Sequence, residues 1–272
     1  MRPSRFRLIT PLTPVSPVPP VPPPAPATVR SADADEPAAC SADPVSSQVA
    51  VLVLADVAAG HRWWGWSRIV LGPRRLRKVP GLGFAKVLGS GYGGGFGLRP
   101  SPSCQGLFLL FANETAADEF LDASSALAAY RARCRELCTV KLRAWSSRGS
   151  WNGTRLVPAS AVPVDGPVAA LTRASIRLPR ALEFWRRAPA AQAALAAAPG
   201  CRLAAGLGEA PLLRQVTFSV WDSVRAMDAY ARSGAHLDAI LAARHGRYFS
   251  ESMFVRFVPV SIQGVWQGVR HG

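Results

Sequence analysis

The sequence is short of acidic residues: 17 Asp and Glu stand against 32 Lys and Arg in 272 residues, which gives a formal net charge of +15. Cysteine is also scarce, with five residues and no Cys-x-x-Cys pair. This excludes a disulfide-stapled miniprotein and favours a reducing compartment. No uninterrupted apolar run reaches about 18 residues, so we expect no membrane-spanning helix. Because 49% of the residues are hydrophobic, the chain can form one or two domains with sizeable cores.

Proline is concentrated near the start of the chain, where 12 of the 24 prolines lie in residues 1–47. Proline lacks the amide donor and fixes its own φ angle, so such a segment forms neither a helix nor a central strand. The same segment holds four basic and four acidic residues and adds nothing to the net charge. We predict that residues 1–47 are a disordered, Pro-rich N-terminal tail outside the fold.

The remainder of the chain contains the same pattern twice. Each half has a strand-like apolar run, a basic helical segment with Trp, a glycine turn, a β-type run, an amphipathic helix and a closing strand that ends in Trp-x-Gly. The opening runs cover 49–54 and 168–172, and the Trp-x-Gly endings cover 151–153 and 266–268. The order β-α-β-β-α-β is that of the ferredoxin-like fold. We therefore predict an α+β protein with two ferredoxin-like halves, 48–165 and 166–272.

The amphipathic helix that follows Glu114 indicates how each half is covered. Its expected apolar stripe consists of Phe120, Leu127, Tyr130, Cys134 and Leu137, and such a stripe packs on a sheet. A sheet covered on one face leaves the other face bare, so two copies can close their bare faces into a fused, dimeric α+β barrel-like unit. The interior would then be either an apolar ligand pocket or a filled core. The sequence leaves both alternatives open.

The glycine-rich run at 89–95 invites a nucleotide-binding interpretation, which its context excludes. No Gly-Lys-Ser or Gly-Lys-Thr follows, so it is not a phosphate-binding loop, and no helix follows as a dinucleotide fingerprint requires. We interpret it as a flexible loop that acts as a lid over the mouth of the pocket.

The positive charge is shared by the two halves, with a net +8 in 48–165 and +7 in 166–272. Its densest segment, 61–78, has six basic and no acidic residues. A basic segment with clustered Trp is typical of a helix that lies on a membrane surface. We predict that a membrane-facing or substrate-access surface is formed by Trp63, Trp64, Trp66 and Arg68. Zinc-finger, RNP and helix-turn-helix signatures are missing, so we expect no nucleic-acid partner.

Several blocks of sequence, in a consistent order, resemble the spheroidene monooxygenase family of bacterial carotenoid-modifying enzymes. The blocks are 84–91, 165–174, 181–187, 208–213 and 215–221, and the resemblance extends over 49–268. It implies an O2-dependent monooxygenase that puts a keto group, through hydroxylation, on an acyclic carotenoid such as spheroidene. It also implies haem b, electrons from a reduced ferredoxin-type donor, and a cytoplasmic protein peripheral to the inner face of the cytoplasmic membrane. The tail and the Gly93–Gly95 run are departures from the family pattern.

The resemblance also implies site residues. His236 matches a family histidine and lies at the edge of an apolar helical stripe, so it is the predicted axial ligand of the haem iron, with His245 as runner-up. Its alternative role is that of a half-exposed helix histidine. Arg173 and Gln215, on second-half strands, are the predicted groups that steer O2, although each could equally face solvent. The alternative function is a non-catalytic protein of the same fold that binds an apolar ligand, carotenoid or haem.

Overall fold

Runs rich in apolar residues form long antiparallel strands in the computed structural model, which describes residues 47–272 apart from residue 211. The predicted tail therefore lies, except for Ser47, outside the described residues. The first half contains β1 Val49–Val57, α1 Arg62–Leu76, β2 Leu82–Gly91, β3 Pro100–Phe111, α2 Glu114–Ala123, α3 Ser125–Arg131 and β4 Cys134–Gly149. The second contains β5 Val168–Ile176, α4 Ala181–Ala196, β6 Cys201–Ala210, β7 Arg214–Trp221, α5 Val224–Ala231, α6 Gly234–His245, β8 Phe249–Trp266 and β9 Val269–His271. Short 3-10 helices are η1 Ala59–His61, η2 Tyr92–Gly94 and η3 Leu178–Arg180.

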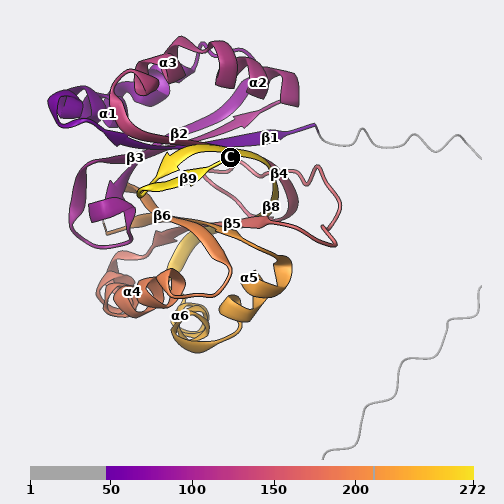
Figure 1. Ribbon diagram of the computed structural model, residues 1–272. Coiled ribbons are helices and arrows are strands. Elements are labelled where there is room, and N and C mark those ends of the chain that lie inside the picture. Colours follow the sequence, from indigo (N-terminus) through magenta and orange to yellow (C-terminus); the bar gives the residue numbers. More distant parts are fainter. Residues whose placement is uncertain (1–46, 211) are drawn as a thin grey trace, which may run out of the picture. The chain divides into compact units, whose positions relative to one another are not determined.

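Eight of these strands close into an antiparallel barrel (Figure 1). The strand order is β4-β1-β3-β2 in the first half and β6-β7-β5-β8 in the second. The halves are joined by a short β2–β6 pair, with Gly89 opposite Gly208, and by the long β4–β8 pair. The predicted α+β class is confirmed, and closure occurs within one chain.

The interior of the barrel is filled by side chains. Along β1, Leu52 and Leu54 point into the barrel, whereas Val51 and Val53 point toward the helices, as the two-residue period of a strand requires. The largest inward side chains are almost completely buried: Phe108, Trp151, Phe218, Phe257 and Trp266. Of the two alternatives for the interior, the structure has the filled core.

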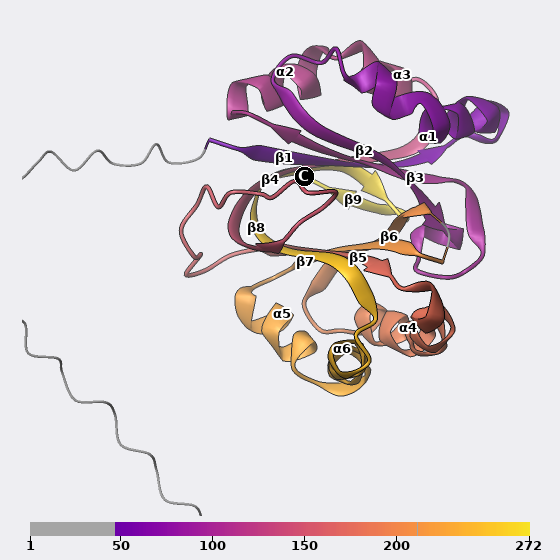
Figure 2. The same ribbon diagram turned by 180° about the vertical axis from the view of Figure 1, so that it is seen from behind.

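Helices cover the outer faces of both half-sheets, with α1–α3 on one side of the barrel and α4–α6 on the other (Figures 1 and 2). The single amphipathic helix expected after Glu114 is two helices. Ser124 adopts an extended backbone (φ −67°, ψ 123°), and its hydroxyl caps α3 by accepting from the Ala126 and Leu127 amides. Cys134 and Leu137, which were expected on that helix, already belong to β4.

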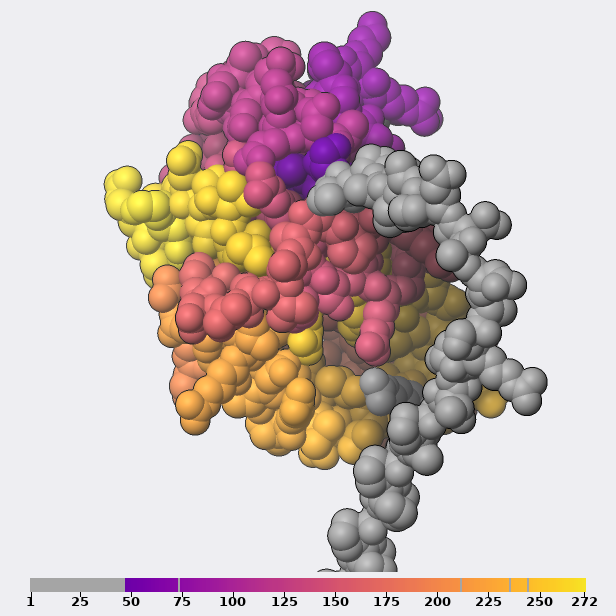
Figure 3. Space-filling view, turned by 90° about the vertical axis from the view of Figure 1, so that its right-hand side faces the viewer, coloured from indigo at the N-terminus to yellow at the C-terminus, as the bar shows by residue number. Residues whose placement is uncertain are grey.

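Both Trp-x-Gly endings form the same tight turn. Each has two consecutive residues at positive φ, as a type I′ turn requires. The pairs are Asn152 (52°) with Gly153 (77°), and Gln267 (52°) with Gly268 (78°). A carboxylate from the other half binds each turn: Glu251 accepts from the Gly153 amide at 3.3 Å, and Glu136 accepts from the Gln267 and Gly268 amides at 2.8 and 3.0 Å. The residues between β4 and β5, which include the first of these turns, cross the surface of the molecule (Figure 3).

Other contacts also recur at equivalent places. Lys141 Nζ lies 2.7 Å from Asp118 Oδ1, and Arg256 Nη2 lies 2.9 Å from Asp228 Oδ1. The ring pairs that pack a helix on the sheet are Phe111 with Phe120 and Trp221 with Tyr230, at centroid distances of 5.4 and 5.1 Å. The two halves thus share strand order, turns and helix–sheet contacts.

Candidate functional site

A pocket of about 210 Å³ lies outside the barrel, between α1, α3 and the outer face of β2 and β3. Its lining is Trp64, Arg68, Gly72, Arg75, Leu76, Val87, Leu107, Ser125, Ala126, Ala129 and Tyr130. The pocket is larger than the engineered cavity of about 150 Å³ that binds benzene. It is smaller than the roughly 300–1,000 Å³ that encloses a drug-sized ligand. It therefore has room for part of a large ligand.

Small residues allow this pocket to form. A Cβ on Gly72 would come within 2.7 Å of Val87 Cγ2, so glycine lets α1 lie close to the sheet. Ala126 and Ala129 present only methyl groups from α3. The floor is apolar because Val87 and Leu107 point away from the barrel.

The polar rim of the pocket is cationic. The guanidinium carbons of Arg68 and Arg133 each lie 5.2 Å from the ring centroid of Trp64. Tyr130 packs edge-on against Trp64 at 4.9 Å and donates to Gln105 Oε1 at 3.0 Å. Burial raises the pKa of Tyr130, so its phenol stays protonated. Burial, followed by the charge of Arg75, lowers the pKa of Arg68.

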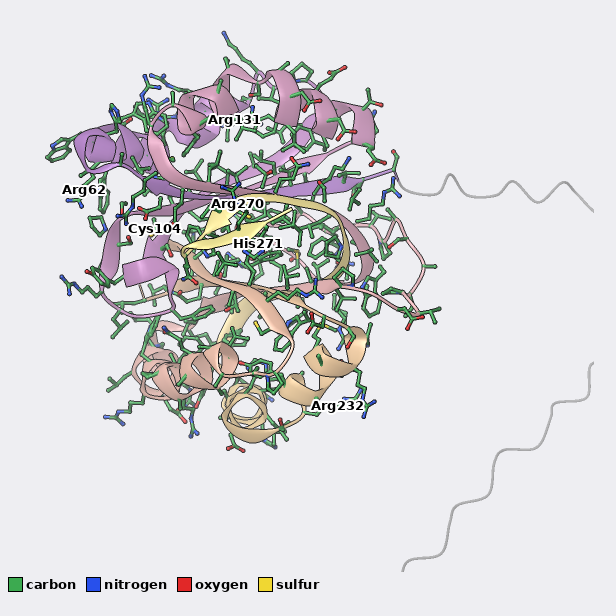
Figure 4. The ribbon with its side chains drawn as sticks, viewed as in Figure 1. Arg62, Cys104, Arg131, Arg232, Arg270 and His271 are labelled. Carbon is green, nitrogen blue, oxygen red and sulfur yellow. The ribbon has the colours of Figure 1, made fainter. Side chains whose placement is uncertain are left out.

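The structure divides the predicted membrane-facing surface between two faces of α1. Trp63, Trp66 and Val70 are 90%, 45% and 74% exposed and fall within about 60° of one another on the helix. Trp64 and Arg68 instead turn inward and line the pocket. In Figure 4, Arg62 lies at the start of α1 on the outside of the molecule.

Arg173 is placed inside the barrel, where it is 1% exposed. Its guanidinium binds two carboxylates, with Nη2 3.1 Å from Glu209 Oε2 and Nη1 2.5 Å from Glu251 Oε2. Lys86 Nζ adds a contact of 2.6 Å to Glu209 Oε1, and Arg173 Cζ lies 5.9 Å from the ring centroid of Trp151. We call Lys86, Arg173, Glu209 and Glu251 the barrel ion cluster.

The charges of the barrel ion cluster balance, with two cations and two carboxylates. Burial raises the pKa of Glu209, but hydrogen bonds from Lys86 and Arg173 outweigh it, and the net effect lowers this pKa. The pKa of Glu251 is lowered in the same way against its burial, by the Gly153 amide and by Arg173 among others. Arg173 Nε is buried without a hydrogen-bond partner. The guanidinium is thus already neutralised by protein carboxylates, and its role near oxygen stays a prediction.

Gln215 is not brought together with Arg173. Its neighbour Val216 points into the barrel and pairs with Arg173 across the β5–β7 ladder. Successive side chains of a strand point to opposite faces. Gln215 therefore lies on the outer face of the sheet.

The two predicted haem ligands lie in the outer helical layer of the second half. His236 on α6 stacks on Tyr230 with ring centroids 4.4 Å apart, and burial lowers its pKa. His245 is exposed, and its Nδ1 lies 2.8 Å from the Leu241 carbonyl oxygen. Because Arg173 points into the barrel, the sheet separates it from His236.

In this outer layer of the second half, side chains fill the space beside the sheet. α4 and α6 pack against each other, and Phe96 packs against the apolar cluster formed there by Val168, Leu195, Trp221 and Met227. Its amide donates to Gln192 Oε1 on α4 at 3.1 Å. The glycine-rich run, interpreted above as a flexible lid, leads into this anchored segment.

Sequence reasoning missed Lys86, Glu209 and Glu251. The signal that could have found Glu209 is the two-residue alternation of side chains along a strand. In β6, Leu203, Ala205 and Leu207 point inward, and Glu209 continues the same period. A charge at an inward position requires a partner inside.

The described residues contain neither a metal-binding cluster nor a membrane-spanning helix. In this part of the chain, His, Cys, Asp and Glu form no group of three or more that could hold a metal ion. Nor does it contain a helix of the length and apolarity needed to cross a membrane.

Known proteins resemble the chain along most of its length. Spheroidene monooxygenase of Rubrivivax gelatinosus is 61% identical over 224 residues, which cover 82% of this chain and 87% of the relative. That of Rhodobacter capsulatus is 35% identical over 209 residues, 75% of this chain and 87% of the relative. That of Cereibacter sphaeroides is 32% identical over 213 residues, 76% and 65% of the two chains. No family model matches.

Solved structures match the chain less closely. An anthrone oxidase-like protein has a TM-score of 0.30 at 13% identity, covering 83% of this chain and 97% of that one. A monooxygenase-like protein from Listeria innocua has a TM-score of 0.28 at 10% identity, covering 78% and 96%. The curated relatives decide the assignment: the chain belongs to the spheroidene monooxygenase family.

Proposed function

We propose that this protein is an O2-dependent monooxygenase that converts an acyclic carotenoid, such as spheroidene, to a ketocarotenoid. The observation that carries this is the 61% identity to the spheroidene monooxygenase of Rubrivivax gelatinosus over most of both chains. Each hydroxylation would use one O2, two electrons and two protons, inserting one oxygen atom into a C–H bond and reducing the other to water. A second hydroxylation at the same carbon would give a gem-diol, which loses water to form the ketone.

The electrons would come from a reduced ferredoxin-type donor. The formal charge of +15 supports this proposal, because a strongly basic protein attracts an acidic partner over long distances. We further propose that the two halves are copies of one ferredoxin-like unit. The shared strand order and the recurring turns support that proposal.

Isotope labelling tests the activity. Expression beside an acyclic carotenoid pathway under oxygen-18 gas is expected to yield a ketocarotenoid, analysed at once by mass spectrometry because ketone oxygen exchanges with water. Hydroxylated intermediates, which do not exchange, should carry the label. Carotenoid that copurifies unchanged would contradict the enzyme and favour the alternative, a non-catalytic binder of an apolar ligand.

We propose that the outer face of α1 docks on the inner face of the cytoplasmic membrane. A carotenoid is insoluble in water, so its enzyme must meet it at a bilayer. Trp63, Trp66 and Val70 supply exposed apolar area, and the helix has basic but no acidic residues. Aromatic rings at headgroup depth and arginines near anionic lipid are the two contributions that hold such helices.

The double variant Trp63→Ser/Trp66→Ser is expected to weaken binding to vesicles of phosphatidylglycerol and phosphatidylcholine at least tenfold, because two exposed rings lose their apolar contact. Cosedimentation measures this. The matched control Leu178→Ser/Leu182→Ser also removes two exposed apolar side chains, from η3 and α4, and is expected to bind like wild type. Equal loss in both variants would overturn the assignment to α1.

The fit of haem b to this structure is incomplete. His236 offers a suitable donor, because its lowered pKa keeps the imidazole neutral and able to coordinate iron. The pocket beside α1, however, lies in the other half and is lined by no histidine, cysteine or methionine. The predicted ligand His236 and the pocket therefore do not coincide.

Haem binding by His236 stays a prediction that spectroscopy can test. Protein expressed with haem supply is expected to show a Soret band, and His236→Ala is expected to weaken or shift it. The control His245→Ala, at the runner-up position, should leave the band unchanged. A colourless protein would contradict the cofactor, and a response to His245→Ala alone would move the ligand to that residue.

A further inference from the structure

Three guanidinium groups surround the pocket beside α1, and the part of the chain that the structure describes supplies no carboxylate counter-ion to them. Arg68 and Arg75 line it, and Arg133 flanks it across Trp64. Arg68 donates from Nη2 to the hydroxyl of its neighbour Ser67 at 3.1 Å. Within residues 47–210 and 212–272, no Asp or Glu forms an ion pair with any of these three arginines.

Three arginines that lie on the strands, by contrast, have carboxylate partners. Arg135 pairs with Asp56, Arg256 pairs with Asp228, and Arg173 has two carboxylates. Like charges held together raise the electrostatic energy of the folded state, and a bound anion would lower it through charge-assisted hydrogen bonds. The rim of the pocket is therefore complementary to a carboxylate or a phosphate.

The apolar lining of the pocket requires that the ligand also have an apolar part. Leu76, Val87 and Leu107 form a buried apolar floor, and Ala126 and Ala129 add an apolar side. Inorganic phosphate would satisfy the guanidinium groups and leave this surface wet. An anionic group joined to an alkyl chain satisfies both, because the chain covers the floor.

We propose that the pocket beside α1 binds an anionic amphiphile, with its carboxylate or phosphate at Arg68 and Arg75 and its alkyl chain on the floor formed by Val87 and Leu107. At about 210 Å³ the pocket accepts only part of the chain. The other face of the same helix carries Trp63 and Trp66. A lipid bound between α1 and the sheet would thus stabilise the position of the helix that we propose to dock on the bilayer.

Calorimetry with four probes tests the proposal, with the amphiphiles used below their micelle-forming concentrations. Decanoate carries the charge and the chain, decanol carries the chain alone, and inorganic phosphate carries the charge alone. Decanoate is expected to bind at least tenfold more tightly than either of the others. Dihexanoyl phosphatidate serves as the phosphate source, and the tighter of the two anions identifies the natural headgroup. Equal binding of decanol and decanoate would overturn the proposal.

Charge and shape are tested by separate variants, each with a matched control. Arg68→Gln/Arg75→Gln is expected to weaken decanoate binding at least tenfold, whereas Arg148→Gln/Arg225→Gln removes the same charge from exposed positions and should not. Ala129→Phe fills the pocket and is expected to abolish binding, whereas Ala128→Phe places the same ring on the exposed face of α3. Urea unfolding identifies any variant that fails to fold. If the charge variant or the shape variant fails to fold, the other of the two decides the proposal.

The outcome is independent of catalysis, because these titrations measure no turnover. Failure of the carotenoid assay with intact decanoate binding would reject the proposed function alone. Decanoate binding that survives both Arg68→Gln/Arg75→Gln and Ala129→Phe would reject the pocket alone.

Discussion

Replacing Arg173 by methionine is expected to lower the free energy of unfolding by about 3–5 kcal/mol, because removal of one partner leaves buried charges uncompensated. Arg173 is 1% exposed and holds Glu209 and Glu251. Urea unfolding at pH 7 measures the loss. The control Arg148→Met changes an exposed arginine and is expected to stay within about 0.5 kcal/mol of wild type.

The pH dependence separates lost charge pairing from lost packing. In the wild type the pKa values of Glu209 and Glu251 are lowered from 4.5. The stability that these carboxylates contribute is therefore fully present above about pH 4.5 and is lost as the pH falls through their folded pKa values. Without Arg173, the same carboxylates are easier to protonate in the folded state. Protonation at low pH removes their uncompensated charge and therefore reduces the loss of stability in the variant. The stability difference between wild type and Arg173→Met should be largest at pH 7 and shrink below pH 4.5. A constant difference would contradict the electrostatic explanation.

Trp151→Ala is expected to cost about 3–5 kcal/mol, as large-to-small changes of buried aromatic residues do. Trp151 is 0% exposed, stacks on Phe108 at 5.2 Å and lies edge-on to Phe84 at 5.5 Å. No neighbouring backbone can collapse easily into the space, because the barrel wall is a continuous ladder of strands.

The same substitution at Trp63 is the control for Trp151→Ala. Trp63 is 90% exposed, so its removal leaves no cavity and is expected to change the free energy of unfolding by less than about 0.5 kcal/mol. Thermal unfolding of both variants checks this. Similar losses would mean that Trp151 is not part of a packed barrel interior.

The features that the sequence predicts well depend on local patterns. A short apolar run predicted a strand over 49–54, and β1 is Val49–Val57. The repeated Trp-x-Gly predicted matching ends of the two halves, and both are turns with paired positive φ angles. Strand period and turn chemistry involve neighbours in the chain, so they can be read without knowing the fold.

The site could not be predicted to the same depth because it depends on distances between segments. Glu209 and Glu251 lie on different strands, and only the closed barrel brings both to Arg173. In the sequence, Gln215 and Arg173 are both polar residues on expected strands, with nothing to distinguish the faces on which they lie. The register between the two strands places them on opposite faces of the sheet. The pocket beside Trp64 depends on the spacing of two helices, which no local pattern encodes.

The closure of the barrel through β4–β8 and β2–β6 has a consequence for synthesis on the ribosome. Gly89 pairs with Gly208, and Cys138 pairs with Gly264, so both seams join residues more than a hundred positions apart. When the first half has emerged, β2 and β4 are unpaired edges beside a bare apolar sheet face, which is a surface prone to aggregation. β8, which is translated almost last, completes both the wall and the core. The nascent chain therefore needs protection until translation is almost finished, and pairing over such distances makes the final closure slow.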